Sequence, residues 1–291
     1  MTTSTTAPPA PVFEDEFEQP SSTRTELWRS ASSQIAVAIL LLVFAAALWE
    51  IIKWLTGTNN IKMPHVWDIL GFYGSDTSQG ENYTVFLLRN VWSTAKAAAI
   101  GLLLGTVFGL ISGALIARSR VIGSGFMPLV VAAQAVPIVA VAPALVLWLG
   151  TGGSTKAAIA TYLTYFPITV ATARGIQAVP ADSHDLLRTY GAPKRTVLTT
   201  LEVPFALPLI FVGLETAAAF SVVGAIVAEL PFGSKEGLGV VILTSWQFFI
   251  FEPRALYAVA IAACMLGAVF VLVVRGIGFF ALGHRGQGDV L

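Results

Sequence analysis

The stretch ADSHDLLRTYGAPKRTVLTTLEVP, residues 181–204, lies between two long apolar runs and is called the polar segment below. It holds six of the chain's 17 basic and 17 acidic residues. Charged side chains are costly in hydrocarbon. The polar segment therefore lies in water or against a protein partner.

Local signals within the polar segment predict two short helices. Asp182 or Ser183 caps the first helix, and Gly191 ends it in a left-handed turn. Pro193 starts the second helix, and Pro204 opens the next apolar run. One face of the first helix is apolar and needs a cover, and its residues are Leu186, Leu187 and Tyr190.

The composition outside the polar segment is typical of a polytopic membrane protein. Of the 291 residues, 55% are hydrophobic and 12% are charged, and the mean hydropathy is +0.76. A soluble domain carries about 25% charged residues. The formal net charge of zero implies no attraction to nucleic acid. Cys264 is the only cysteine, so neither an internal disulfide nor a cysteine metal cluster is expected, and no metal site is predicted.

Apolar runs predict an all-α fold with six transmembrane helices. The runs are 35–52, 91–117, 121–149, 157–173, 205–230 and 255–274. Pro128, Pro137 and Pro143 interrupt the third run. The connections 56–90 and 231–254 lie on the side opposite the polar segment, and the second of them has an apolar middle that re-enters the membrane partway.

The chain then divides into three parts. Residues 1–30 form a disordered tail, residues 31–280 form the transmembrane domain that includes the polar segment, and residues 281–291 form a second tail. Ten Lys and Arg residues fall on the side of the tails and the polar segment, against six on the other side. The positive-inside rule places that side in the cytoplasm, so both termini are cytoplasmic.

A glycine ladder marks the second span. Gly101, Gly105, Gly109 and Gly113 fall on one helical face and allow a neighbouring backbone to approach closely. The ladder predicts a helix-packing seam, and the alternative is chance in a glycine-rich chain.

The polar segment resembles the coupling loop of permease subunits of bacterial binding-protein-dependent ABC importers. The family pattern is Glu-Ala-Ala, three residues, Gly, nine residues, Ile, any residue, Leu-Pro. The matching residues here are Asp185-Leu186-Leu187, Gly191, Leu201, Val203 and Pro204. The spacing fits throughout, but Asp replaces Glu, two Leu replace two Ala, and Val precedes the last Pro.

A second stretch resembles the branch of this family that carries nitrate, sulfonate, taurine and vitamin precursors. That branch has Gln-x-x-Pro, then a proline-containing run that ends in Trp-x-Gly. The matching residues are Gln134, Pro137, Pro143, Trp148 and Gly150. Glu229, ahead of Gly237-Leu238-Gly239, resembles a Val-x-Glu of the same branch. The run before Trp148 looks slightly more like the vitamin-precursor and pyrimidine permeases.

The resemblance implies a MetI-like permease fold with a cytoplasmic coupling helix. The residues it assigns to ATPase coupling are Asp185, Leu186, Leu187, Arg188, Tyr190, Gly191 and Pro204. The candidates for the solute pathway are Gln134, Pro137, Tyr162, Tyr165, Glu215 and Glu229. For some of these candidates a structural alternative to the pathway role stays open. Gln134 and Pro137 could instead form a structural kink. Glu215 could instead make a buried interhelical hydrogen bond.

The function implied is that of the membrane-spanning permease subunit of an ATP-driven importer for a small polar solute, in the bacterial cytoplasmic membrane. The chain needs no cofactor, because ATP is bound by separate ATPase subunits. The further partners are an extracytoplasmic substrate-binding protein, a second permease chain (identical or paralogous) and the lipid bilayer. The alternative is a secondary transporter or channel that works without an ATPase. A membrane-embedded enzyme is disfavoured, because all three His residues lie outside the predicted spans.

Overall fold

The computed structural model describes residues 24–77, 79–230 and 234–282, and the chain divides into two compact units, residues 1–57 and 58–291. The described part of the first unit contains one helix, α1 (Arg24–Thr56), which includes the first predicted span. α1 begins inside the segment 1–30 for which the sequence predicts a disordered tail. The first 23 residues and the tail from residue 283 lie outside the described residues.

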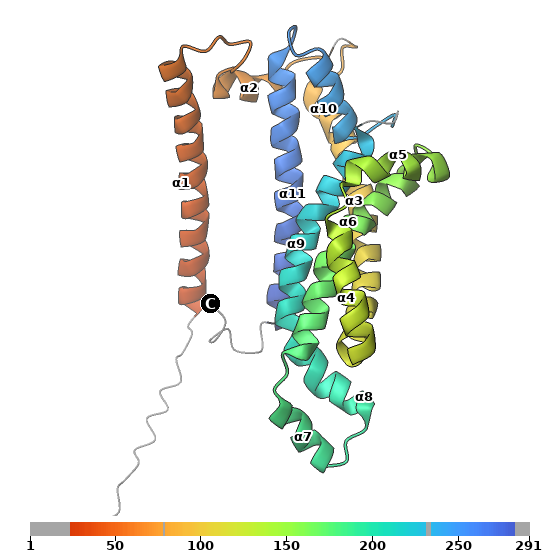
Figure 1. Ribbon diagram of the computed structural model, residues 1–291. Helices are drawn as coiled ribbons and strands as arrows, with labels where there is room; N and C mark the ends of the chain where they lie inside the picture. Colours follow the sequence, from red (N-terminus) through yellow and green to blue (C-terminus); the bar gives the residue numbers. More distant parts are fainter. Residues whose placement is uncertain (1–23, 78, 231–233, 283–291) are drawn as a thin grey trace, which may run out of the picture. The chain divides into compact units, whose positions relative to one another are not determined.

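The described residues of the second unit are mainly helical (Figure 1). The elements are α2 (Val66–Phe72), α3 (Tyr83–Arg118), α4 (Arg120–Gln134), α5 (Ile138–Leu149), α6 (Gly153–Gln177), α7 (Ala181–Thr189), α8 (Lys194–Thr196), the π-helix η1 (Val197–Glu202), α9 (Val203–Glu229), α10 (Leu238–Gln247) and α11 (Pro253–Leu282).

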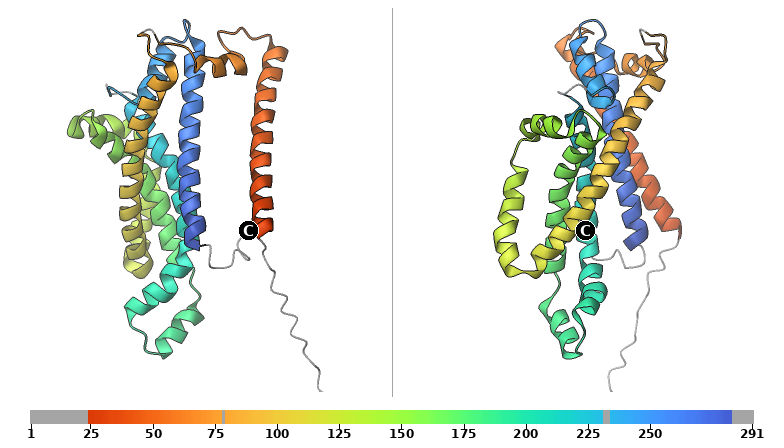
Figure 2. Two further views of the ribbon diagram at one scale, coloured as in Figure 1. Left: turned by 180° about the vertical axis from the view of Figure 1, so that it is seen from behind. Right: turned by 90° about the vertical axis from the view of Figure 1, so that its right-hand side faces the viewer.

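Three long helices, α3, α6 and α9, pack along one another at the centre of this unit (Figures 1 and 2). The glycine ladder of α3 lies against α6, where the partner residues are also four apart. The pairs are Gly101 with Ala160, Gly105 with Thr164, Gly109 with Ile168, and Gly113 with Thr172. A Cβ atom at Gly113 would lie 2.6 Å from the Cβ of Thr172. Since real Cβ atoms do not approach so closely, a larger residue at this position would force the two helices apart.

α6 and α9 approach each other in the same way. A Cβ atom at Gly213 would lie 2.4 Å from the Cβ of Ala171, and one at Gly224 would lie 2.8 Å from the Cα of Ala160. Small residues thus line both sides of α6, as is common where membrane helices pack closely. α3, α6 and α9 therefore form one tightly packed body.

The third apolar run does not form one straight span. α4 and α5 meet at an angle of 94° in a break that ends at Pro137. Pro128 and Pro143 stay inside their helices. Pro137 differs from them because it stands at the N-cap of α5, in an extended conformation that ends the helical path.

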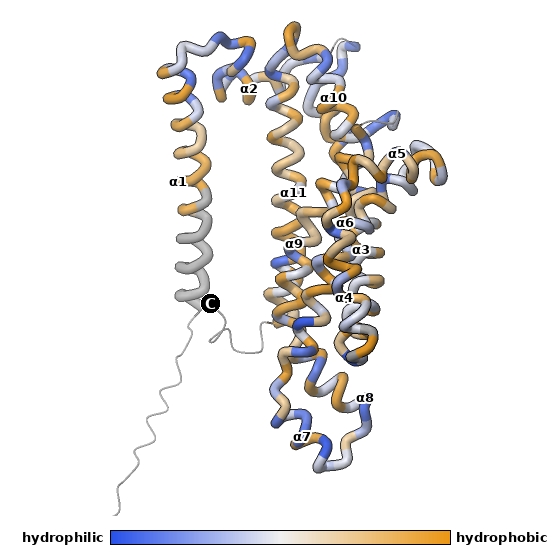
Figure 3. Tube along the Cα trace, viewed as in Figure 1, coloured by the Kyte–Doolittle hydropathy of each residue, from blue (hydrophilic) through white to orange (hydrophobic). Residues whose placement is uncertain are grey.

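Four described helices are long and apolar enough to cross a membrane, and the bent pair α4 and α5 adds a fifth candidate. These helices carry the apolar colour along much of their length in Figure 3. The remaining predicted span lies in α6, which has 25 residues and so the length for a crossing. Its threonines and charged ends make α6 less apolar, but much of its surface faces α3 and α9.

The second span begins earlier than the predicted residue 91. α3 starts at Tyr83, because the side chain of Asn82 accepts a hydrogen bond of 3.0 Å from the backbone N–H of Thr84 and caps the helix. The hydroxyl of Tyr83 donates to the carbonyl of Ala255 at 3.3 Å and ties this end to α11.

The second predicted connection contains α10, a helix of ten residues, where the sequence predicts partial re-entry. α10 is too short to cross a membrane. It packs against α3, α9 and α11 at the end of the bundle opposite the polar segment (Figures 1 and 2).

Candidate functional site

The polar segment projects beyond one end of the bundle (Figures 1 and 2). It consists of α7, a turn at Gly191, α8, η1 and the first residues of α9. α7, α8 and η1 contain no buried residue. The exposure of the polar segment thus agrees with its charge content.

The two ends of α7 were predicted with different success. The helix starts at Ala181 after Pro180, with no side-chain cap, so the prediction that Asp182 or Ser183 caps it is wrong. Asp182 lies instead in the first turn, where a negative charge interacts favourably with the helix dipole. The predicted left-handed turn is present, since Gly191 has a φ of +67°.

Two backbone hydrogen bonds complete this turn. The N–H of Gly191 donates to the carbonyl of Arg188 at 3.0 Å, and the N–H of Ala192 donates to the carbonyl of Leu187 at 3.0 Å. This is the Schellman arrangement, in which a left-handed glycine lets the chain satisfy the last carbonyls of a helix. α7 is therefore a helix with a defined end.

α7 exposes an apolar pair. Leu186 is 58% exposed and Tyr190 is 80% exposed, and they are one helical turn apart. Asp185 and Arg188 are also exposed, and Leu187 is half-buried. An exposed apolar pair with charges at its rim has the character of a protein-binding patch.

Pro204 lies in the first turn of α9, at the opening of the apolar run where the sequence places it. The helical run is continuous over Lys194–Glu229, and η1 is a π-helical turn in which the N–H of Val203 donates to the carbonyl of Leu198. Pro204 has no N–H, and its ring would clash with a carbonyl in a regular α-helix. A wider π turn relieves this conflict. The polar segment is thereby joined to α9 without a loop.

The pathway candidates lie in different places. Gln134 and Pro137 are exposed at the break between α4 and α5. The hydroxyl of Tyr162 donates to the carbonyl of Ala133 at 2.6 Å and so holds α6 to this break. The ring of Tyr165 packs edge-on against Phe166, with their centroids 5.3 Å apart.

Glu215 and Glu229 lie on the same helix in different surroundings. Glu215 is half-buried in the middle of α9. Glu229 is the last residue of α9 and is 1% exposed. Because its carboxylate is enclosed by protein, Glu229 does not line an open path in this structure.

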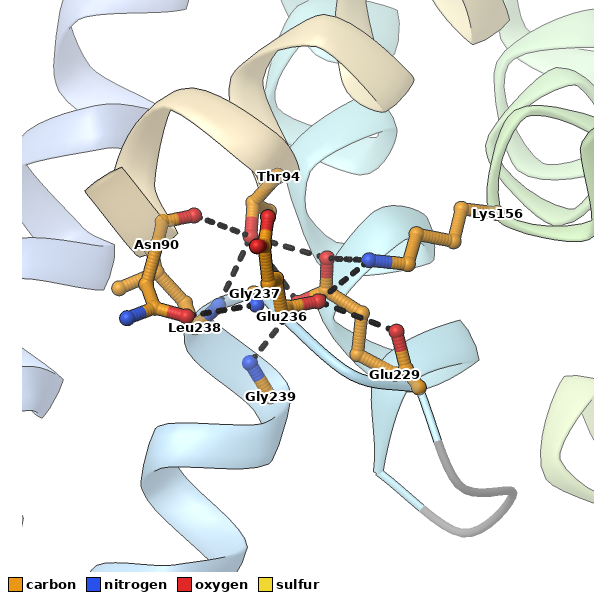
Figure 4. A network of polar contacts seen from close by, with 9 residues as sticks. Asn90, Thr94, Lys156, Glu229, Glu236, Gly237, Leu238 and Gly239 are labelled. Carbon is orange, nitrogen blue, oxygen red and sulfur yellow. Dashed lines mark hydrogen bonds and ion pairs between the residues drawn. The ribbon is translucent and has the colours of Figure 1, made fainter. Parts of the chain in front are cut away.

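The carboxylate of Glu229 is the centre of a buried network, which comprises Asn90, Thr94, Lys156, Glu229 and the backbone of residues 236–239 (Figure 4). The ammonium group of Lys156 lies 3.0 Å from Glu229 Oε1, and the Thr94 hydroxyl donates to the same carboxylate at 2.9 Å. Lys156 also donates to the carbonyl of Glu236. A buried charge is tolerated where it is paired and hydrogen-bonded, as both charges are here.

The buried network caps the N-terminus of α10. The first backbone N–H groups of a helix have no partner within the helix. Here the N–H of Gly237 donates to Asn90 Oδ1 at 2.8 Å, that of Leu238 to Thr94 Oγ1 at 2.8 Å, and that of Gly239 to Glu229 Oε2 at 2.9 Å. All three acceptors come from α3 and α9, so these helices fix where α10 begins.

Glycine is required at this junction. Gly237 has a φ of +131°, and a Cβ atom there would lie 2.1 Å from the Glu229 carboxylate. A Cβ atom at Gly239 would lie 2.4 Å from the carbonyl oxygen of Ile226. The motif Gly237-Leu238-Gly239, noted from the sequence, thus lets the backbone approach the buried charge.

Sequence reasoning missed Lys156, Asn90 and Thr94 as members of one site. Lys156 lies between the predicted spans 121–149 and 157–173, outside both. A usable signal existed, because Asn90 and Thr94 fall on the face of α3 that carries the glycine ladder. Lys156 likewise lies four residues before Ala160, which faces Gly101, so both fall on the same face of α6.

A pocket of about 530 Å³ borders the buried network, on the side of Asn90. α10 supplies one wall with Val241 and Ser245, and α3 supplies another with Tyr83 and Phe86. The pocket thus lies at the end of the bundle that is opposite the polar segment.

A bundle of long apolar helices with an exposed, helical polar segment defines a polytopic membrane protein. The chain belongs to the family described as "Binding-protein-dependent transport system inner membrane component", whose pattern matches residues 105–279. It is a permease subunit of a binding-protein-dependent ABC importer, that is, a component of a transporter. This membership favours the importer over the secondary transporter or channel.

Curated relatives support the assignment. The chain is 36% identical over 192 residues to a probable ABC transporter permease protein of Haemophilus influenzae, with 65% of this chain and 78% of that protein covered. It is 38% identical over 147 residues to the formylaminopyrimidine transport permease ThiX of Halalkalibacterium halodurans, with 50% and 58% covered. It is 31% identical over 234 residues to the riboflavin transport system permease RibX of Chloroflexus aurantiacus, with 80% and 83% covered.

A solved structure shows the same fold. A chain of the MetNI methionine ABC transporter in an inward-facing conformation aligns with a TM-score of 0.56 at 16% identity. The alignment covers 67% of this chain and 95% of that chain. The predicted all-α, MetI-like permease fold is thereby confirmed, and the chain is a multi-pass membrane protein.

Proposed function

We propose that the polar segment is the docking site for a separate ATPase subunit, which binds and hydrolyses the ATP that drives transport. The observation that carries this proposal is the exposed pair Leu186 and Tyr190 on a helix that projects beyond the bundle. Because the turn at Gly191 is closed by hydrogen bonds and the helical run continues into α9, the polar segment is an ordered helical element and not a flexible loop.

The orientation follows from the same proposal. The polar segment and both termini lie in the cytoplasm of a bacterial cell, in agreement with the excess of Lys and Arg on that side. A substrate-binding protein then docks on the opposite face, which carries α2 and α10. A second permease chain completes the membrane path.

The solute is a small polar compound, and we propose a vitamin or pyrimidine precursor. The relatives with the higher identities include permeases named for formylaminopyrimidine and riboflavin, at 38% and 31%. Permeases named for aliphatic sulfonates and nitrate are 28% and 24% identical. The solute passes Gln134, Pro137, Tyr162, Tyr165 and Glu215 in this proposal.

Binding of the ATPase tests the docking site directly. The full chain carrying Leu186→Glu is co-expressed with a candidate ATPase subunit from the same genome and purified through a tag on the permease. Loss of co-purified ATPase is expected, because a carboxylate replaces the apolar anchor. Ala181→Glu is the control, since it adds the same side chain to an exposed site about 140° away around α7. Normal ATPase recovery with Leu186→Glu would contradict the proposal.

A further inference from the structure

The two helices that leave the polar segment meet again at their far ends. α6 ends at Gln177, just before α7, and its first turn carries Lys156. The continuous helical run that begins with α8 ends at Glu229. Lys156 and Glu229 form the ion pair of the buried network. Both routes from the polar segment into the bundle therefore end in the same pair of charges.

α6 and α9 are packed closely enough to move together. Gly213 lies on Ala171, and Gly224 lies on Ala160, with no space for a side chain at either glycine. A third contact of this kind, between Gly175 and Ala206, lies near the polar segment. Close-packed interfaces transmit displacements instead of absorbing them. A displacement of α7 thus reaches Lys156 and Glu229.

The ion pair is also what holds α10. Glu229 accepts the N–H of Gly239, and Lys156 donates to the carbonyl of Glu236, just ahead of the helix. A buried ion pair is a weak source of stability compared with apolar packing, but it fixes orientation. The start of α10 is therefore held by the ends of α6 and α9 as well as by α3.

α10 in turn forms a wall of the pocket of about 530 Å³. Ser245 lies in this wall and is 8% exposed. Another wall includes Phe72, the last residue of α2. The helix α2 itself packs against α11. A shift of α10 relative to α2 changes access to the pocket.

We propose that Lys156 and Glu229 are positioning residues, which transmit a displacement of the polar segment to α10. In this way they control access to the pocket. The proposal rests on the proposed function, since the ATPase supplies the displacement. Loss of Lys156 removes the bond to the Glu236 carbonyl and leaves the Glu229 carboxylate without its cation, and loss of Glu229 removes the acceptor of the Gly239 N–H.

The experiment measures how fast a thiol at Ser245 reacts. The exposed Cys264 is first replaced in the variant Cys264→Ser, and Ser245→Cys is added. The complex with its ATPase and binding protein is reconstituted in liposomes and treated with a membrane-impermeant maleimide, either without nucleotide or trapped with ATP and vanadate. Labelling is expected to be about tenfold faster in the trapped state, because the pathway then opens outward.

Lys156→Met in the same background is expected to abolish this difference while ATP hydrolysis continues. Arg89→Met is the matched control, because it breaks the exposed ion pair of Arg89 with Glu81 and leaves the buried network intact. A structural role alone would alter labelling equally in both states, so the ratio of the two rates is the readout. Glu229→Gln, which keeps the side-chain shape, is the second variant if Lys156→Met fails to assemble.

Two results would overturn the proposal. One is an equal labelling rate, with and without trapped nucleotide, of the protein that carries only Ser245→Cys and Cys264→Ser. This measurement involves no substitution in the buried network. The other is a full ATP-dependent difference in Lys156→Met or Glu229→Gln. A parent complex that assembles no ATPase, or hydrolyses no ATP, would instead refute the proposed function.

Discussion

Lys156 and Glu229 stand 73 residues apart in the chain, and their side chains form a buried ion pair of 3.0 Å. Each belongs to one of the two helices that join the polar segment to the bundle. The pair also holds the start of α10, so one contact connects three helices (Figure 4).

Removal of one partner should cost more stability than removal of both. Lys156→Met leaves a buried carboxylate without its cation, which typically costs about 3–5 kcal/mol. The double variant Lys156→Met with Glu229→Leu should recover part of that loss, since neither charge is left unpaired. Thermal unfolding in detergent measures both effects. A double variant that is no more stable than Lys156→Met would contradict the expectation.

Alanine in the glycine ladder should separate α3 from α6. A Cβ atom at Gly105 would lie 1.9 Å from the hydroxyl of Thr164. Gly105→Ala should therefore lower the melting temperature, although alanine is normally favoured over glycine in a helix by about 1 kcal/mol. Gly276→Ala in α11 is the control, because nothing lies within 4 Å of its added Cβ. A Gly105→Ala protein at least as stable as the control would refute the close approach.

The turn at Gly191 should tolerate only residues that accept a left-handed conformation. Gly191→Pro removes the N–H bonded to Arg188 and forces φ negative, so ATP hydrolysis should be uncoupled from uptake. Asp185→Lys should also uncouple, by reversing a charge at the rim of the exposed patch. Gly191→Asn is the control, because asparagine adopts this conformation at low cost. Solute uptake per ATP hydrolysed, at equal membrane expression, decides the outcome.

Gly237 should be intolerant of any side chain. Its φ of +131° and the distance of 2.1 Å from a built Cβ atom to the Glu229 carboxylate both exclude alanine. Gly237→Ala should displace α10 and raise the reactivity of a thiol at Ser245. Gly267→Ala, which meets no neighbour within 4 Å, is the control. Unchanged thiol reactivity in Gly237→Ala would show that the junction is not tight.

Local pattern was enough for much of this protein. The apolar runs gave the long helices, and the spacing around Gly191 gave the left-handed end of α7, because both depend on residues a few positions apart. The ends of elements were less well predicted. α3 starts at Tyr83, because Asn82 caps the helix ahead of the apolar run, and α7 starts at Ala181, directly after Pro180.

The sequence by itself determined the helices, the polar segment and the family resemblance, because periodicity, charge and turn residues act over short stretches of chain. Only the tertiary structure decided that Lys156 and Glu229 meet and that Asn90 and Thr94 cap α10. It also decided the 94° bend between α4 and α5. The pairing of a lysine in one helix with a glutamate in another depends on how close-packed helices align. The helical period shows on which face of its helix a residue lies, but not which residue of another helix it meets.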